Sequence, residues 1–462
     1  MNNTVSKKDD LDPFVLKSAI ILVFGVLAPL LDSTMVNVAL KTIAANFEAN
    51  ISVVQWITTG YVLAMGLSVP ISSWAVNRFG CKRIYLFSLM LFFIGSIMAF
   101  FSWNIQSLIC FAVIQGVGAG IMMPTFQTAL VQISGGNNLG RIMSIVSIPA
   151  LLGPILGPVL GGILVNVFGW RSIFFVNIPI CIIAFFLTYY KIPSDKKNNT
   201  EAKLDILGLL MVSPAFSLLI FGISKTAKYG NIYNRFVMIP IISGLLLTAL
   251  FIIYALKTKK DPVLKLQLFR SKNFCISNML LFITGTITNG AMLLLPLYFQ
   301  NLHGANTLYA GLWLIPQGLG MLLTRGWVGK VADRDGSRKV SFLSLIATLL
   351  GTLPFVVAGG DTNLILLSLA LLVRGAGLGG LLIAIMASAY TGLDKKDIPY
   401  ASTTTRILQT IGGAFGSAIL SVVIQSQSSG YEKSFQLAFF WVSIFTLAAA
   451  ILSLFLPKRS RC

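Results

Sequence analysis

The sequence SWAVNRFGCKR at residues 73–83 has a close counterpart, GKVADRDGSRK, at residues 329–339. The two stretches align without gaps at an offset of 256 residues, and each follows a long apolar segment. Solvation of a linker requires polar residues, but it does not explain why the same polar sequence recurs at matching positions. We therefore interpret the chain as two related halves. A second repeat supports this interpretation: QGVGAG at 115–120 resembles RGAGLG at 374–379.

The composition predicts a membrane protein, because 56% of the 462 residues are hydrophobic and only 11% are charged, against about 25% charged in soluble domains. A membrane-spanning helix needs about 20 mainly apolar residues. The charge-free runs predict fourteen spans, at 14–39, 51–71, 84–102, 106–128, 142–166, 172–190, 205–224, 235–256, 274–300, 308–328, 340–359, 363–390, 400–426 and 435–456.

The spans and the repeat together predict an all-α polytopic fold made of two six-helix bundles and two extra central transmembrane helices. The predicted parts are an N-terminal tail (1–13), a first bundle (14–190), basic linkers with the extra pair (191–272), a second bundle (273–457) and a C-terminal tail (458–462). Repeated halves around a midplane site are a recurrent transporter architecture.

The net charge of +20 does not indicate a nucleic-acid-binding protein, because the basic residues follow the topology. Of the 35 Lys and Arg, Arg374 lies within a span and only six lie on the side opposite the termini: Lys41, Arg171, Lys225, Lys228, Arg235 and Lys433. The excess on the other side predicts cytoplasmic termini. The polar start leads into a long apolar run without a cleavage pattern, so we expect the first span to be retained.

Asp32 is the one acidic residue deep in a predicted span. It lies nine residues before Lys41, which places it roughly 13 Å inside the outer end of that helix, near the middle of the membrane. Burial favours the neutral form of a carboxyl group and a nearby cation favours the charged form. Such a group can gain and release a proton in a gated cavity. The alternative is a structural aspartate that bonds a hydroxyl group or Arg374.

The fifth predicted span contains GPILGPVLGG at 153–162. Glycines every four residues form a ridge on which another helix can pack closely, and each proline removes a backbone donor. A generic glycine-rich membrane helix is the alternative reading. The residues concerned are Gly153, Pro154, Gly157, Pro158, Gly161 and Gly162.

These motifs, with LDSTMVNVAL (31–40), QWITTGYVLAMGLSVP (55–70) and WRSIFFVNIPI (170–180), resemble the major facilitator superfamily and, within it, the fourteen-span drug:proton antiporters. The resemblance covers residues 14–457. It implies that Asp32 carries the proton, that the fifth-span motif seals the bundles, and that the two repeated loops gate the cytoplasmic side. The implied gating residues are Asn77, Arg78, Gly80, Lys82, Arg83, Asp333, Arg334, Gly336, Arg338 and Lys339.

The chain departs from the family pattern at five positions, and one of them is Lys41, which replaces a proline at the end of the span-one motif. Asn77 replaces an acidic residue in the first loop, and Ser73 stands where glycine is usual. Ser144 replaces a glycine ahead of the fifth-span motif, and Ala112 occupies the place of a span-four arginine. Arg374 is the lone deep basic residue in this interpretation. It either couples to Asp32, binds an anionic group of the substrate, or serves helix packing.

The candidates for lining a substrate cavity are polar or aromatic residues inside spans: Gln55, Trp56, Tyr61, Gln115, Asn289 and Arg374. Each has a plainer reading as an interhelical hydrogen bond or an interfacial anchor. We find no nucleophile, nucleotide-binding or metal-ligand pattern, so we predict neither an enzyme nor a cofactor, and expect the proton gradient to supply the energy.

The sequence therefore predicts a monomeric, proton-coupled exporter of small amphipathic, cationic compounds in the plasma membrane. It would bind protons, small-molecule substrates and lipid, and no nucleic acid. Two alternatives stay open. One is an exporter of a dedicated metabolite such as an amino acid, siderophore or sugar derivative. The other is a non-transporting membrane sensor or scaffold.

Overall fold

The computed structural model describes residues 12–135, 138–193, 204–229, 233–258, 262–305, 307–426 and 430–456, and the regular elements in them are helices. The first half contains α1 (Pro13–Asn46), α2 (Ile51–Val54), α3 (Trp56–Ser68), α4 (Ile71–Phe79), α5 (Cys81–Phe100), α6 (Ile105–Ile133), α7 (Leu139–Phe168) and α8 (Ser172–Lys191). A central pair, α9 (Ile206–Tyr229) and α10 (Arg235–Lys257), and a 3₁₀ turn, η1 (Leu266–Arg270), follow. The second half contains α11 (Lys272–Leu302), α12 (Thr307–Leu312), α13 (Ile315–Asp335), α14 (Ser337–Val357), α15 (Leu364–Tyr390), α16 (Ile398–Ser426) and α17 (Tyr431–Ser453).

Each of the fourteen predicted segments falls on a helix, but two of these helices are broken. α3 and α4 meet at a 52° bend, where Pro70 lacks the N–H that would continue the helical hydrogen bonds. Pro316 lies in the first turn of α13, a position where a missing N–H is tolerated. It separates α13 from the short helix α12.

Within the described residues, eleven helices are long and apolar enough to cross a membrane, or twelve if α3 and α4 form one span. The two long helices that remain are α7 and α13. The second half of α13 carries five charged residues, which lowers its hydropathy: Arg325, Lys330, Asp333, Arg334 and Asp335. Fourteen spans therefore stays a prediction, while the all-helical, multi-span character is observed.

The two halves have separate hydrophobic cores. One core contains buried side chains from Ala19 to Ile192, and the other contains side chains from Leu268 to Leu456. Val131, Leu139 and Met143, at the facing ends of α6 and α7, join the second core. The halves therefore touch through the C-terminal end of α6 and the N-terminal end of α7.

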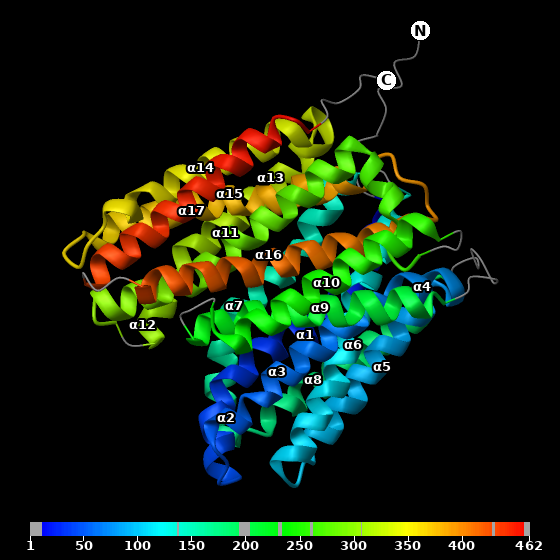
Figure 1. Cartoon of the computed structure of the whole chain (residues 1–462), viewed down its shortest axis with the longest axis horizontal. Coiled ribbons are helices and arrows are strands. Elements are labelled where there is room, and N and C mark those ends of the chain that lie inside the picture. Colours follow the sequence, from blue (N-terminus) through cyan, green and yellow to red (C-terminus); the bar gives the residue numbers. More distant parts are fainter. Residues whose placement is uncertain are drawn as a thin grey trace.

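The helices of the two halves meet at one end and diverge at the other (Figure 1). α4 lies at the end where they meet, and α2 and α12 lie at the diverging ends. Side-chain hydrogen bonds join the halves where they meet: the Ser72 and Thr403 hydroxyl oxygens are 3.0 Å apart, and the Tyr390 hydroxyl donates to Gln127 Oε1 over 3.4 Å. Among the described residues, the contacts close the end to which α4 belongs.

The sequence repeat is also a repeat of backbone geometry. Gly80 ends α4 with φ 89° and ψ 153°, and Gly336 ends α13 with φ 89° and ψ 154°. Residues with a Cβ atom rarely adopt a positive φ angle, which explains why glycine occupies both turns. The two cytoplasmic-loop candidates therefore have the same turn at equivalent places.

The glycines of the second repeat, at 115–120 and 374–379, also occupy equivalent packing positions. Gly116 of α6 lies against the Tyr61 carbonyl of α3, and Gly375 of α15 lies against the Gln317 carbonyl of α13. Tyr61 and Gln317 are themselves 256 residues apart. A Cβ atom at either glycine would overlap the neighbouring backbone. Glycine here lets the helices of each half approach closely.

The central pair lies across the two halves. The Ser217 hydroxyl of α9 donates to the Leu63 carbonyl of α3 over 3.3 Å. On its other side α9 packs on α16, where Leu219 and Ile223 form a cluster with Ala418. Figure 1 shows α9 and α10 running alongside α16. The pair is therefore part of the helical body, and not a separate linker.

Candidate functional site

Asp32 is buried inside the first half, with 2% of its surface exposed. Asn177 Nδ2 of α8 donates a hydrogen bond to Asp32 Oδ1 over 2.6 Å, and Asn177 is itself fully buried. A hydrogen bond to a charged group contributes about 1.5–3 kcal/mol. No salt bridge of Asp32 is found in the described part of the chain, so the amide is its identified partner.

Asp32 lines a cavity of about 270 Å³. Asp32, Ser33, Val36 and Asn37 line it from one face of α1, because residues one, four and five positions apart share a helix face. The other walls come from α3, α6, α8 and α9, through Ile57, Thr58, Thr59, Tyr61, Val62, Leu63, Ala112, Gln115, Phe174, Ile220, Phe221 and Ser224. Asp32 is the single formally charged residue in this lining.

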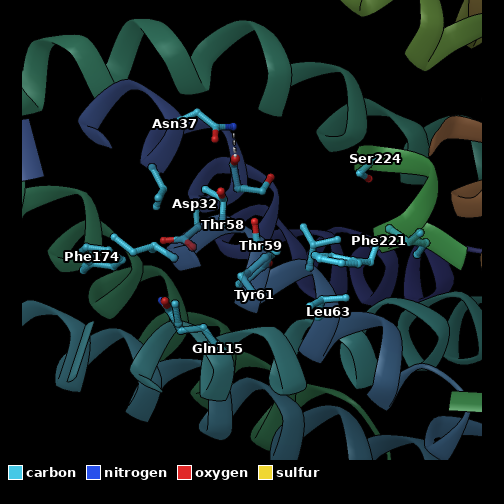
Figure 2. Close-up of a pocket in the computed structure, with 16 residues that line it drawn as sticks. Asp32, Asn37, Thr58, Thr59, Tyr61, Leu63, Gln115, Phe174, Phe221 and Ser224 are labelled. Atoms are coloured by element: carbon cyan, nitrogen blue, oxygen red, sulfur yellow. Dashed lines mark hydrogen bonds between the residues drawn. The ribbon is translucent and has the colours of Figure 1, made fainter. Parts of the chain in front are cut away.

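The cavity wall is mixed in character. Figure 2 shows Asp32 near Phe174 at one end and Phe221 at the other, with Tyr61 and Thr59 between them. Hydroxyl groups, aromatic rings and one carboxylate are the groups that bind an amphipathic cation: the rings attract it through their faces and the carboxylate offsets its charge. The cavity can therefore hold a small organic molecule beside a buried acid.

Two of the sequence-predicted cavity residues line this cavity, namely Tyr61 and Gln115. Gln115 also donates from Nε2 to the Ser96 hydroxyl over 2.8 Å. Trp56 is 45% exposed and stacks on Phe221, with ring centroids 6.4 Å apart. Gln55 and Asn289 are exposed and are not in the lining.

Arg374 is 1% exposed and lies inside the second half. Its Nη1 donates to Gln317 Oε1 over 2.6 Å, and its Nε donates to the Thr352 hydroxyl over 3.3 Å. It is therefore hydrogen-bonded within its own bundle, and not to Asp32. The expectation of a lone deep basic residue was wrong, since Arg325 of α13 is also buried, at 5% exposed. Its position near the end of a predicted span hid this burial.

The glycine ridge of α7 packs against α1. A Cβ atom on Gly157 would overlap the Thr34 side chain, and one on Gly161 would lie 3.1 Å from the Met35 Cα atom. Gly162 faces open space. The described ridge therefore forms a seam within the first half, next to the Asp32 turn of α1. The side-chain surroundings of Gly153, Pro154 and Pro158 lie outside the described residues.

The structure describes the side chains of some, but not all, of the predicted gating residues. Asn77 is buried, and Lys82 Nζ donates to the Tyr189 carbonyl at the end of α8 over 2.7 Å, where helix carbonyls lack intrahelical donors. Arg78 lies in the last turn of α4 and Arg334 in the last turn of α13, while Arg338 and Lys339 lie in the first turn of α14. Arg83 is exposed, and the Asp333 side chain lies outside the described residues.

Sequence reasoning missed the amide partner of Asp32 and the contribution of α9. The available signal is that Asn177 is the one side-chain amide within the apolar run 172–190. Ile220, Phe221 and Ser224 carried no signal, because their residue types are ordinary in an apolar helix. Only the packing of α9 against α3 shows that they reach the cavity.

The fold and the buried site define a multi-span membrane protein with an internal cavity. The chain belongs to the Major Facilitator Superfamily, whose family model matches residues 22–417 and 279–461. It is 35% identical over 429 residues to a multidrug resistance protein B homolog of Mycobacterium tuberculosis, covering 92% of this chain and 79% of that protein.

Two further comparisons extend this relationship. The riboflavin transporter RibZ of Clostridioides difficile is 28% identical over 419 residues, covering 90% of both chains. A solved structure of a double-tryptophan mutant of XylE superposes with a TM-score of 0.72 at 14% identity, covering 97% of both chains. The chain is thus a membrane transport protein of this superfamily, a group of small-molecule transporters and not enzymes.

Proposed function

We propose that this protein is a proton-coupled efflux transporter that exports small amphipathic cations by alternating access, with Asp32 as the proton carrier. The observation that carries the proposal is the buried Asp32 carboxylate, the one charged group in the lining of the 270 Å³ cavity. An ionisable residue inside a membrane bundle is costly and marks a pathway or a proton relay. The relationship to a multidrug resistance protein B homolog supports drug efflux.

In this proposal the fourteen helical segments cross the plasma membrane, a single chain suffices, and both termini are cytoplasmic. The contacts at the α4 end close the cytoplasmic side, through Ser72 with Thr403 and Gln127 with Tyr390. A proton from outside neutralises Asp32, a substrate cation displaces it, and rocking of the halves exchanges the two. The exchange of one proton for one singly charged cation moves no net charge, so the pH gradient supplies the free energy.

The test uses purified protein in liposomes with an imposed pH gradient and a pH-sensitive dye inside. Lipophilic cations, neutral drugs and small organic acids are added to the wild type, to Asp32→Asn and to the control Asp394→Asn, whose carboxylate is exposed. We expect cation-dependent proton flux in the wild type and the control, and at least a tenfold loss in Asp32→Asn. Retained flux in Asp32→Asn removes this residue from the mechanism.

A second candidate function is the export of a dedicated metabolite. The likeness to a riboflavin transporter favours it, and so does the buried guanidinium of Arg374, which could bind an anionic group. Transport of organic acids or riboflavin, without transport of lipophilic cations, would select this function.

A further inference from the structure

The central helix α9 reaches the cavity that contains Asp32. Ile220, Phe221 and Ser224 lie one and four positions apart, so they share the face of α9 that lines the cavity. Phe221 is visible in Figure 2 at the end of the cavity opposite Asp32. The cavity is therefore bounded by four helices of the first half and by one helix of the central pair.

The position of α9 is fixed by close packing. Gly66 of α3 faces α9: a Cβ atom there would be 3.0 Å from the Ser217 hydroxyl oxygen and 3.5 Å from the Phe216 ring. Gly222 on the other side of α9 allows a similar approach by Ile241 of α10. Small residues at helix contacts permit such approach in membranes. The wall that α9 provides is thus held from two sides.

The Phe221 ring already binds a cation from the protein. Lys225 Nζ lies 5.0 Å from the centre of this ring, and Trp56 stacks on it. A cation over an aromatic face gains about 0.5–2 kcal/mol. An organic cation that enters the cavity can contact the same ring, and it then competes with the Lys225 ammonium group.

We infer that α9 forms part of the substrate site, and that the Phe221 ring selects lipophilic organic cations whose charge Asp32 offsets. This inference rests on the proposed function and deepens it, because it gives the central helical pair a role in specificity. Phe221 and Lys225 then have opposite effects on the affinity for an organic cation: the ring raises the affinity and the ammonium group lowers it.

The experiment measures equilibrium binding of tetraphenylphosphonium to purified, detergent-solubilised full-length protein without a gradient. Neutral triphenylphosphine oxide is the comparison ligand. Phe221→Leu removes the ring and keeps an apolar side chain, whereas Phe221→Trp keeps a ring. Lys225→Gln removes the competing charge. Leu210→Ala, a 63% exposed position on α9, is the matched control.

We expect Phe221→Leu to weaken tetraphenylphosphonium binding about fivefold, a change within the range of a cation–π contact, and to leave triphenylphosphine oxide binding within twofold. Phe221→Trp and Leu210→Ala should bind as the wild type does, and Lys225→Gln should bind the cation more tightly. Equal cation binding in Phe221→Leu and Leu210→Ala overturns the inference, and so does a wild type that binds no cation.

The proposed function fails in a different way. If the wild type binds tetraphenylphosphonium through Phe221 but Asp32→Asn still drives export with the pH gradient, the α9 site stands and the role of Asp32 in coupling does not. If coupling depends on Asp32 but the Phe221 variants bind normally, the proposed function stands and the role of α9 is wrong.

Discussion

Asn177 Nδ2 donates to Asp32 Oδ1 over 2.6 Å, while Asn177 Oδ1 accepts no hydrogen bond among the described residues. A side-chain amide carries both donors and an acceptor. In the orientation found here it suits the ionised carboxylate, and after rotation its oxygen would suit a protonated one. One amide can thus serve both states of a proton carrier, which a hydrophobic residue could not do.

We predict that Asn177→Leu shifts the pH at which export is half-maximal to higher values. Without the donor, the ionised form of Asp32 loses its hydrogen bond and the neutral form is favoured. The measurement is proton-driven export across a series of internal pH values, and a superimposable profile in Asn177→Leu would contradict the prediction.

Arg374 and Gln115 are equivalent in the two halves, 259 residues apart, and bond equivalent partners: Thr352 and Ser96, which are 256 residues apart. We predict that Arg374→Gln folds and exports cations at close to the wild-type rate. Arg374→Leu should be less stable, because it removes the hydrogen bonds from the guanidinium group to Gln317 and Thr352, and a hydrogen bond to a charged group contributes about 1.5–3 kcal/mol.

Thermal unfolding in detergent and cation export together check the two Arg374 variants. Loss of export in Arg374→Gln with normal unfolding would show that the guanidinium group takes part in coupling. Loss of acid transport alone would favour the metabolite exporter.

The packing of the α7 glycines predicts that alanine substitutions at different positions change stability by different amounts. Gly157→Ala should destabilise the α1–α7 seam by about 1–3 kcal/mol, since its methyl group would overlap Thr34 and force the helices apart. Gly162→Ala, whose methyl group enters open space, is the control and should be neutral. Unfolding temperature and export are measured for both. Equal behaviour of the two variants would mean that the ridge does not pack as described.

A disulfide bond between the two halves can hold the α4 end of the molecule closed. The Ser72 and Thr403 hydroxyl oxygens are 3.0 Å apart across the two halves, so cysteines at both positions fall within reach of a disulfide, whose Cβ atoms lie about 3.5–4.5 Å apart. We predict that oxidised Ser72→Cys/Thr403→Cys loses export and that reductant restores it. The two single variants are controls. Undiminished export by the cross-linked protein would show that this end need not open.

The sequence alone determined the class of this protein. Charge-free runs of about 20 residues predict membrane-spanning helices, because a helix of that length crosses the hydrocarbon core and forms all its backbone hydrogen bonds internally. The repeat at an offset of 256 residues predicted two equivalent halves, and Gly80 and Gly336 do form identical turns. The charge of Asp32 in an apolar run singled out this residue, and the structure places it in the lining of the cavity.

Only the tertiary structure decided which residues meet Asp32. Asn177 lies 145 residues away along the chain, and Phe221 belongs to a helix that the sequence left without a role. Hydropathy reports how each residue partitions between lipid and water, but not which face of a helix meets which neighbour. That choice depends on glycines such as Gly66 and Gly157, where the absence of a Cβ atom sets how closely two helices approach.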